Sequence, residues 1–189
     1  MFDWLWIVLV AVAVLLVVIF AIMLWTAKRS VTKARARVDE AWDEIRGHVQ
    51  RRGELVAQVE GVLRGRAGHE SGALMELEAA RGEALAAEKP STLSRAENRL
   101  QAALRKAFHV AEGYPGLQTD REFLELRSEL SESENKVQAS RRFYNGSVRE
   151  FNAKTKTFPS SLMTKGEQER DFFDAADRAA IAEPPRIQF

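Results

Sequence analysis

The chain contains no cysteine and only 3 histidines among its 189 residues. Without cysteine it has no disulfide, no thiol nucleophile and no thiolate ligand for a metal. Its formal net charge is only +1, so no overall electrostatic field attracts nucleic acid. These absences exclude disulfide-stabilised scaffolds and thiol enzymes, and they predict that nucleic acid is not a partner.

Motifs that hold metals or catalytic groups are missing as well. His48, His69 and His109 begin no His-Glu-x-x-His motif and no Glu-x-x-His pair. Carboxylates are frequent, but basic or amide side chains follow them at the three- and four-residue spacings of a solvated helix surface. We therefore expect no enzymatic activity, no metal site and no cofactor.

Segments that alternate apolar and polar residues over the length of a strand are also absent, whereas strong helix formers dominate. Glycine and proline clusters divide the chain beyond residue 27 into expected helices at about 28–66, 70–88, 92–113, 120–158 and 167–182. The predicted fold is all-α, a single membrane-spanning helix followed by an antiparallel, up-down-up-down bundle of long helices with coiled-coil-like packing.

A long apolar run does occur, at residues 4–27. A helix of that length covers roughly 36 Å, enough to cross a hydrocarbon core of about 30 Å. We therefore expect residues 1–3 outside the cell, 4–27 in the membrane, 28–158 in a cytoplasmic bundle, and 159–189 as a C-terminal segment. The side chains expected at the two membrane interfaces are Trp4, Trp6, Trp25, Lys28, Arg29, Lys33, Arg35 and Arg37.

The basic residues follow the apolar run rather than precede it, which predicts a single pass through the cell (inner or plasma) membrane with the N-terminus outside. Their placement is explained by topology alone. The same charges would also favour anionic lipid headgroups.

A seven-residue repeat runs through the predicted helix at 120–158. Such a repeat indicates left-handed supercoiling against neighbouring helices. Its bulky members are Phe123, Leu130, Val137, Tyr144, Phe151 and Phe158. Serines recur at the same spacing at positions 133, 140 and 147, where they allow close approach of a neighbouring helix.

The predicted helices differ in length in a way that leaves apolar surface uncovered. The helices at 70–88 and 92–113 are about half as long as those at 28–66 and 120–158, so they cover only the membrane-distal half of the long pair. The C-terminal segment or another protomer would have to cover the rest. The candidate residues for the bundle core or a partner contact are Trp42, His48, Arg52, Tyr144, Phe151, Phe158, Phe172 and Phe173.

His48 and Arg52 fall within the apolar rows of the first bundle helix. Our preferred interpretation is a buried polar pair, met across the bundle by Glu132 or Asn135, that fixes helix register. The alternative interpretation is a contact with a partner or ligand.

Several motifs in order carry a family resemblance. They are Arg37-Val38-Asp39-Glu40-Ala41-Trp42, Ala111-Glu112-Gly113-Tyr114-Pro115, and Arg141-Arg142-Phe143-Tyr144-Asn145 followed by Val148-Arg149-Glu150-Phe151-Asn152. Together they resemble the LemA family over nearly the whole chain. The resemblance implies a membrane protein with a short outer N-terminus, a cytoplasmic antiparallel bundle and no established enzymatic activity. The stretch Gly53-Glu54-Leu55-Val56-Ala57-Gln58 departs from the family pattern.

The function expected from these observations is that of a membrane-anchored, non-enzymatic helical scaffold. Its expected partners are membrane lipid, further copies of itself, or a membrane-associated protein. The alternative is a membrane-surface effector that binds anionic lipid through the basic residues after the apolar run and reorganises the bilayer.

Overall fold

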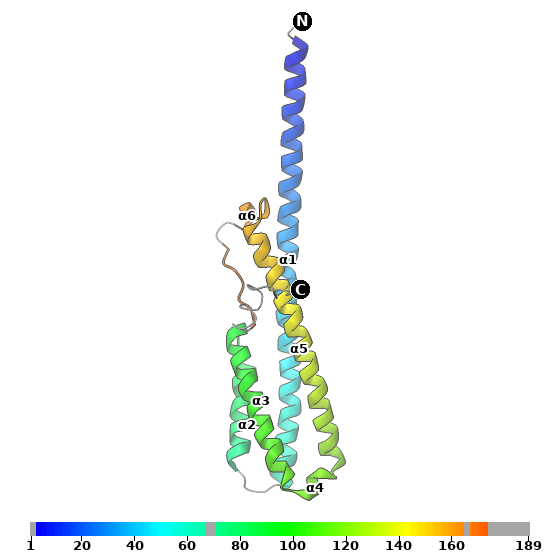
Figure 1. Ribbon diagram of the computed structural model, residues 1–189, viewed down its shortest axis with the longest axis vertical. Helices are drawn as coiled ribbons and strands as arrows, with labels where there is room; N and C mark the ends of the chain where they lie inside the picture. The colour runs from blue at the N-terminus through cyan, green and yellow to red at the C-terminus, as the bar shows by residue number, and fades with distance from the viewer. Residues whose placement is uncertain (1–2, 67–70, 165–166, 174–189) are drawn as a thin grey trace, which may run out of the picture. The chain divides into compact units, whose positions relative to one another are not determined.

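The computed structural model describes residues 3–66, 71–164 and 167–173, which are helical except for short connections and the C-terminal stretch (Figure 1). The helices are α1 (Asp3–Arg66), α2 (Ser71–Ala86), α3 (Pro90–Glu112), α4 (Pro115–Gln118), α5 (Arg121–Lys156) and α6 (Ser160–Met163). Within the described ranges there is no strand, and the predicted all-α, bundle-like fold is confirmed.

The helix α1 is uninterrupted from Asp3 to Arg66. The sequence predicted a membrane helix at 4–27 and a bundle helix at 28–66. These join because the residues at the junction are good helix formers and include neither glycine nor proline. Near its N-terminus α1 holds an 18-residue window with a mean hydropathy of 3.6 in which no residue is buried. By length and composition this stretch is able to cross a membrane.

The backbone divides into two compact units. The first unit comprises Met1–Glu40 and Ser147–Arg170, and the second comprises Ala41–Gly146 and Asp171–Phe189. Both α1 and α5 contribute to each unit, because the division falls within these two helices.

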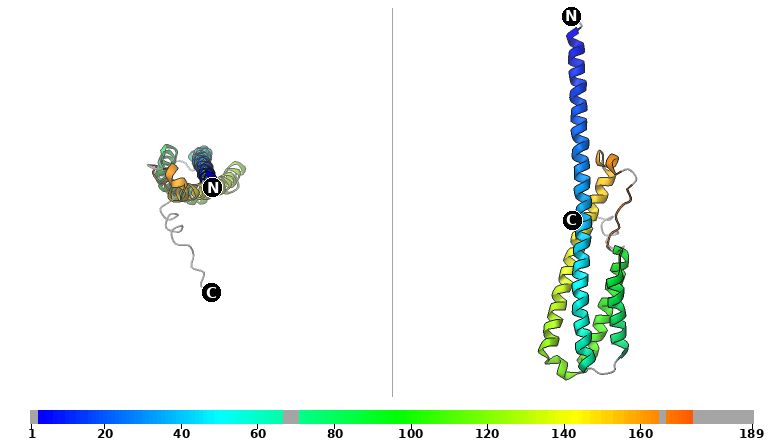
Figure 2. Two further views of the ribbon diagram at one scale, coloured as in Figure 1. Left: turned by 90° about the horizontal axis from the view of Figure 1, so that it is seen from above. Right: turned by 180° about the vertical axis from the view of Figure 1, so that it is seen from behind.

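In the second unit, the later part of α1, α2, α3 and the earlier part of α5 form an antiparallel four-helix bundle (Figure 2). Paired side chains show the directions of neighbouring helices. Arg64 of α1 pairs with Glu78 of α2, and Arg81 of α2 pairs with Glu60 of α1. Lys106 and Arg99 of α3 pair with Glu76 and Glu83 of α2 in reverse order. The core between the helices is apolar and includes Ile45, Val56, Val59, Leu77, Leu93 and Leu100, each at most 1% exposed.

The seven-residue row of α5 is buried over most of its length. Exposed fractions are 2% for Phe123, 5% for Leu130, 2% for Val137, 3% for Tyr144 and 1% for Phe151. The serines at 133, 140 and 147 are also buried. Phe158 departs from the row, at 61% exposed. The sequence assigned it to the bundle core or to a partner contact, and the first of these is wrong because α5 ends at Lys156, so position 158 no longer follows the helical period.

Helix ends differ from the sequence prediction by a few residues. The helix α2 ends at Ala86 rather than about 88, and α3 begins at Pro90 rather than 92, because proline is favoured in the first helical turn. The helix α5 begins after Asp120, whose side chain accepts the Phe123 N–H at 3.1 Å as an N-cap. The short helices α4 and α6 were not predicted.

In the first unit, the end of α5 lies beside α1 and runs in the opposite direction. Arg37 Nη1 of α1 is 3.2 Å from Glu150 Oε2 of α5. Further along α5, Lys154 Nζ donates to Ser30 Oγ at 2.8 Å. A turn that contains the cis Phe158–Pro159 peptide bond leads from α5 into α6.

Residues 167–173, here named the C-terminal strap, are not helical. The predicted helix at 167–182 is therefore wrong over 167–173, and residues 174–182 lie outside the described part of the chain. The physical reason is that side chains of α5, rather than neighbouring turns of a helix, bond the main chain of Arg170 and Phe173.

Candidate functional site

A cluster of charged side chains lies inside the bundle of the second unit. Arg52 of α1 is 3% exposed, and its Nη1 donates to Glu97 Oε2 of α3. The same Nη1 is 2.8 Å from Glu134 Oε2 of α5. Gln138, one turn further along α5, donates to the other Glu134 oxygen at 2.8 Å. Arg52 thus joins three helices of the bundle through ionic contacts.

The burial of this cluster leaves part of its polar capacity unused. Arg52 Nε and Glu97 Oε1 have no hydrogen-bond partner, and Glu134 Oε2 contacts Arg52 without hydrogen-bond geometry. These groups border a cavity of about 20 Å³ that Arg141 and Phe173 also line, which is enough volume for about one water molecule.

The position of Glu97 changes its acidity. Burial raises the pKa of Glu97 above its ordinary value of 4.5, because the charged form loses its hydration. The Arg52 guanidinium opposes this rise, whereas the negative charge of Glu134 adds to it. With two carboxylates and one guanidinium in contact, the site retains a proton more readily than an exposed glutamate does.

The interpretation of Arg52 as a buried polar group is supported by this geometry, but the predicted partners are wrong. Glu97 and Glu134 take the places that the sequence assigned to Glu132 or Asn135. Glu132 is exposed, because it lies on the outer side of α5, two residues after Leu130 of the buried row. His48 is only partly buried and lies 3.7 Å from Glu44 on the same helix, so it does not belong to the cluster.

A second group of contacts in the bundle unit involves Trp42 and Tyr144. The two rings have centroids 5.7 Å apart and are tilted by 53°. Tyr144 Oη donates to the carbonyl oxygen of Asp171 at 2.8 Å, and Asn145 Oδ1 accepts the Phe173 N–H at 3.0 Å. Tyr144 and Asn145 therefore hold the end of the strap through its main chain.

Phe173 anchors this part of the strap through its side chain as well. It is 2% exposed, and the guanidinium carbon of Arg141 lies 5.5 Å from the centre of its ring. Phe172 is only partly buried. Of the two candidate phenylalanines in this segment, Phe173 is thus the one that enters the core.

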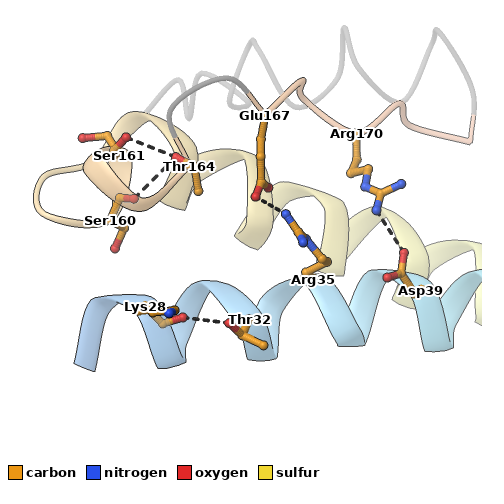
Figure 3. A network of polar contacts seen from close by, with 9 residues as sticks. All are labelled: Lys28, Thr32, Arg35, Asp39, Ser160, Ser161, Thr164, Glu167 and Arg170. Atoms are coloured by element: carbon orange, nitrogen blue, oxygen red, sulfur yellow. Dashed lines mark hydrogen bonds and ion pairs between the residues drawn. The ribbon is translucent and has the colours of Figure 1, made fainter. Parts of the chain in front are cut away.

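The first unit holds the other part of the strap (Figure 3). Asn152 of α5 bonds both main-chain groups of Arg170: its Oδ1 accepts the N–H and its Nδ2 donates to the carbonyl, each at 2.9 Å. Arg170 Nη2 is 3.2 Å from Asp39 Oδ1, and Arg35 of α1 forms an ion pair with Glu167. Lys156 Nζ lies 2.9 Å from Glu169 Oε1.

The strap also bears on how the apolar surface near Tyr144 is covered. The sequence left two candidates for this role, the C-terminal segment and another protomer. The described part of the C-terminal segment contacts Tyr144, Asn145 and Arg141, in a non-helical conformation rather than the expected helix.

The residues expected at the membrane interfaces all lie on α1. Trp4, Trp6 and Trp25 are 61%, 70% and 63% exposed. The Arg29 guanidinium carbon lies 5.7 Å from the centre of the Trp25 ring. Lys28 and Lys33 are exposed, whereas Arg35 and Arg37 pair with Glu167 and Glu150. Two of the basic side chains therefore bind protein carboxylates, which the sequence did not indicate.

Comparison with known proteins decides the family. The LemA family model matches residues 41–189, which is more than half of the chain. The chain belongs to the LemA family. The resemblance inferred from its motifs is thus confirmed, and the matched region begins within α1, after the apolar stretch. No curated protein matches the chain by sequence.

The family motif on α5 includes two residues whose role the sequence analysis missed. Asn145 and Asn152 directly follow Tyr144 and Phe151 of the buried row, and each bonds the main chain of the strap. Their seven-residue spacing was the available signal, because it places both amides beside the same buried row. Glu97 was missed for a different reason, since its helix carries no repeat that singles it out.

The arrangement is suited to structural and binding roles. Within residues 3–66, 71–164 and 167–173, no group of three or more His, Cys, Asp or Glu side chains is placed to hold a metal ion. The buried ionic cluster is able to hold a proton or a water molecule. The amides on α5 are able to bind an extended peptide main chain.

Proposed function

We propose that this LemA-family chain is a membrane-anchored, non-enzymatic helical scaffold. In this proposal the apolar part of α1 crosses the inner or plasma membrane once, with the N-terminus outside and the bundle in the cytoplasm. The bundle then presents its surface to further copies of the chain or to a membrane-associated protein.

The observation that carries the proposal is the exposure of apolar side chains along the first part of α1. Leu15, Val17 and Ile19 are 58%, 68% and 53% exposed, in a stretch where no residue of the apolar window is buried. Contiguous apolar surface on this scale is unstable in water and stable in lipid. Because the same helix continues into the bundle, a membrane-inserted α1 would hold the bundle at the bilayer.

Aromatic residues on the bundle support a role in binding other proteins. Trp42 is only partly buried, and Phe143 is 53% exposed. Tryptophan, tyrosine and phenylalanine are enriched at the centres of protein interfaces.

Native mass spectrometry of the full-length protein, extracted in native lipid particles, tests the scaffold role. A mass that is a multiple of 21.3 kDa, or one that includes a second protein, is the expected result. The variant Trp42→Ala should lower the fraction in the complex while the protein stays in the membrane fraction. A monomer alone, at all concentrations, would contradict the scaffold role.

Membrane anchorage is tested separately by extraction at alkaline pH. The double variant Leu15→Arg/Val18→Arg should leave the membrane pellet, because each charge at the centre of a spanning helix costs about 2.5–3.5 kcal/mol. The variant Gln50→Arg adds a charge to an exposed position later in α1, and it should stay in the pellet. Equal extraction of the two variants would contradict the anchor.

The basic residues of α1 favour a second candidate function, that of a lipid effector. Lys28, Arg29 and Lys33 are exposed, and among the described residues no carboxylate pairs with them. In this alternative they bind anionic headgroups. Replacement of all three by glutamine should then reduce the anionic lipid that copurifies with the protein and abolish any change in vesicle shape. Under the scaffold proposal the same variant keeps its complex.

A further inference from the structure

We infer that the turn after α5 and the short helix α6 form a second contact with lipid, in which Phe158, Leu162 and Met163 enter the headgroup region of the bilayer. This inference rests on the proposed membrane anchor and adds a surface that the anchor itself does not require. We name residues 158–163 the lipid-facing turn.

The lipid-facing turn carries an unusual amount of exposed apolar surface. Phe158 is 61% exposed, Leu162 48% and Met163 37%. These three side chains occur within six residues and in a segment that also contains a proline. Scattered apolar residues on a surface are ordinary, but a local group of large ones marks a binding surface.

The residues that directly follow these apolar side chains make polar contacts within the protein. The Thr164 hydroxyl is near the carbonyl oxygens of Ser160 and Ser161, at 3.4 Å from each, and Thr164 is 4% exposed (Figure 3). Glu167, just beyond, pairs with Arg35 of α1. The chain directly after the exposed apolar side chains is thus fixed by polar contacts with itself and with α1, while those apolar side chains remain on the outside, as in an interfacial segment.

The position of the turn along α1 identifies lipid as the occupant. Lys154 Nζ bonds Ser30 Oγ, three residues after the apolar run ends at Ala27. Since α5 runs antiparallel to α1 here, the last residues of α5, after Lys154, lie closer to that run. Figure 3 shows α6 beside the part of α1 that carries Lys28.

The exposure of α1 itself supports this placement. Ile22 is 55% exposed, whereas Met23 and Leu24 are partly covered and Ala27 is only 6% exposed. Side chains on one side of α1 are therefore already covered by the protein before the apolar run has ended. Trp25, on an open side, remains 63% exposed at the same level, where indole rings favour the membrane interface.

Lysines at the end of α5 are compatible with a position in the headgroup region of the bilayer. Lys156 is exposed beside Glu169, and Lys154 is held by Ser30 and Glu150. Long cationic side chains at this depth extend toward phosphate groups while their methylene carbons remain in apolar surroundings. A protein partner would have to reach this surface within the headgroup layer, so we favour lipid.

Fluorescence quenching in vesicles provides the test. The chain has no cysteine, so one introduced cysteine carries the only thiol-linked fluorophore. We would label Leu162→Cys, and Leu124→Cys as its matched control, because Leu162 and Leu124 are 48% and 45% exposed. A third variant, Val14→Cys, reports on the anchor. The full-length protein is reconstituted in phosphatidylcholine and phosphatidylglycerol vesicles that contain a lipid with a nitroxide headgroup.

The expected result is that the headgroup nitroxide quenches the label at 162 several-fold more strongly than the label at 124. A nitroxide on the acyl chain should quench the label at 14 most strongly. In the background Phe158→Ser/Met163→Ser, quenching at 162 should fall toward the value at 124, with the helical circular dichroism unchanged.

Equal quenching at 162 and 124, with strong quenching at 14, would overturn the second contact and leave the anchor intact. Absence of quenching at 14 would overturn the anchor, and the second contact with it. Quenching at 162 that appears only when a second protein is added would assign the surface to that protein and would also overturn the inference.

Discussion

The two halves of α1 use apolar side chains in opposite ways. In the first half they are exposed on every side as far as Ile22, as at Leu15, which is 58% exposed. In the second half they are confined to the buried face, as at Ile45 and Val56, each 0% exposed. The first half holds no charge between Trp4 and Ala27, whereas the second is charged on its outer face and carries Arg52 within its buried face.

This difference shows how one continuous helix is suited to two environments, lipid along its first half and neighbouring helices along its second. An apolar surface without period suits lipid, which surrounds a helix evenly. An apolar face that recurs every three or four residues suits neighbouring helices, which cover only one side. Substitutions with the same chemistry in the two halves should therefore have different effects.

The largest effect is expected from Arg52, the buried arginine of the second half. Arg52→Met should lower the free energy of unfolding of the bundle by about 3–5 kcal/mol, because the buried Glu97 and the partly buried Glu134 lose their counter-charge. Denaturant unfolding of the full-length protein in detergent measures this change. Arg51→Met is the control, since Arg51 is exposed and pairs with the exposed Glu54, and its effect should stay below about 1 kcal/mol. Equal effects of the two variants would contradict the buried cluster.

A pair of alanine substitutions compares the two halves directly. Ile45→Ala should destabilise the bundle by about 2–5 kcal/mol, because it leaves a cavity in a packed core. Leu15→Ala removes a comparable side chain from the exposed run and should leave bundle stability unchanged, with the protein still in the membrane fraction. If Leu15→Ala destabilises the bundle as strongly, the assignment of the first half to lipid is wrong.

The pH dependence of stability tests the buried cluster in another way. The pKa of Glu97 is higher in the folded than in the unfolded chain, so the folded state binds more protons between these two values. The contribution of Glu97 is therefore complete below its ordinary pKa of 4.5 and is lost as the pH rises through the higher, folded value. Over that window the wild type should lose up to about 1.4 kcal/mol per pH unit relative to Glu97→Gln. Parallel stability profiles of the two proteins would contradict the raised pKa.

The smallest effect is expected at the glycines of the second half. Gly61→Ala should stabilise the bundle by about 0.5–1 kcal/mol, because the added methyl group meets nothing within 4 Å beyond the adjoining backbone of its own helix, and alanine is the better helix former. Gly53→Ala should gain less, because the added methyl group meets Leu85 Cδ2 at 3.0 Å. Thermal unfolding of both variants measures the difference, and a larger gain at Gly53 would show that Leu85 moves freely.

Most of the bundle was predictable from local patterns. The apolar run, the seven-residue row and the glycine and proline positions together predicted the α-helical class and the approximate helices. Phe158 shows the limit of this reasoning, since a periodic row has meaning only while the helix continues. The proline at 159 disfavours helix at the preceding residue, and this effect prevails over the period.

Long-range polar contacts were harder to predict. The burial of Arg52 followed from its place in an apolar row, but its partners come from α3 and α5, whose rotations about their own axes the sequence does not specify. The strap was misassigned because its composition favours helix, whereas its conformation depends on amides of Asn145 and Asn152. Local propensity carries no information about such distant donors and acceptors.

The way α5 binds the strap has a consequence for variation among sequences. Asn145 accepts a main-chain N–H from Phe173, and Asn152 bonds both main-chain groups of Arg170. Groups common to every residue except proline supply these bonds. Substitutions in the strap should therefore be tolerated wherever the side chain is exposed, while each asparagine accepts few replacements. Evolutionary constraint at this contact should fall on the helix that binds rather than on the segment that is bound, with Phe173 as the exception.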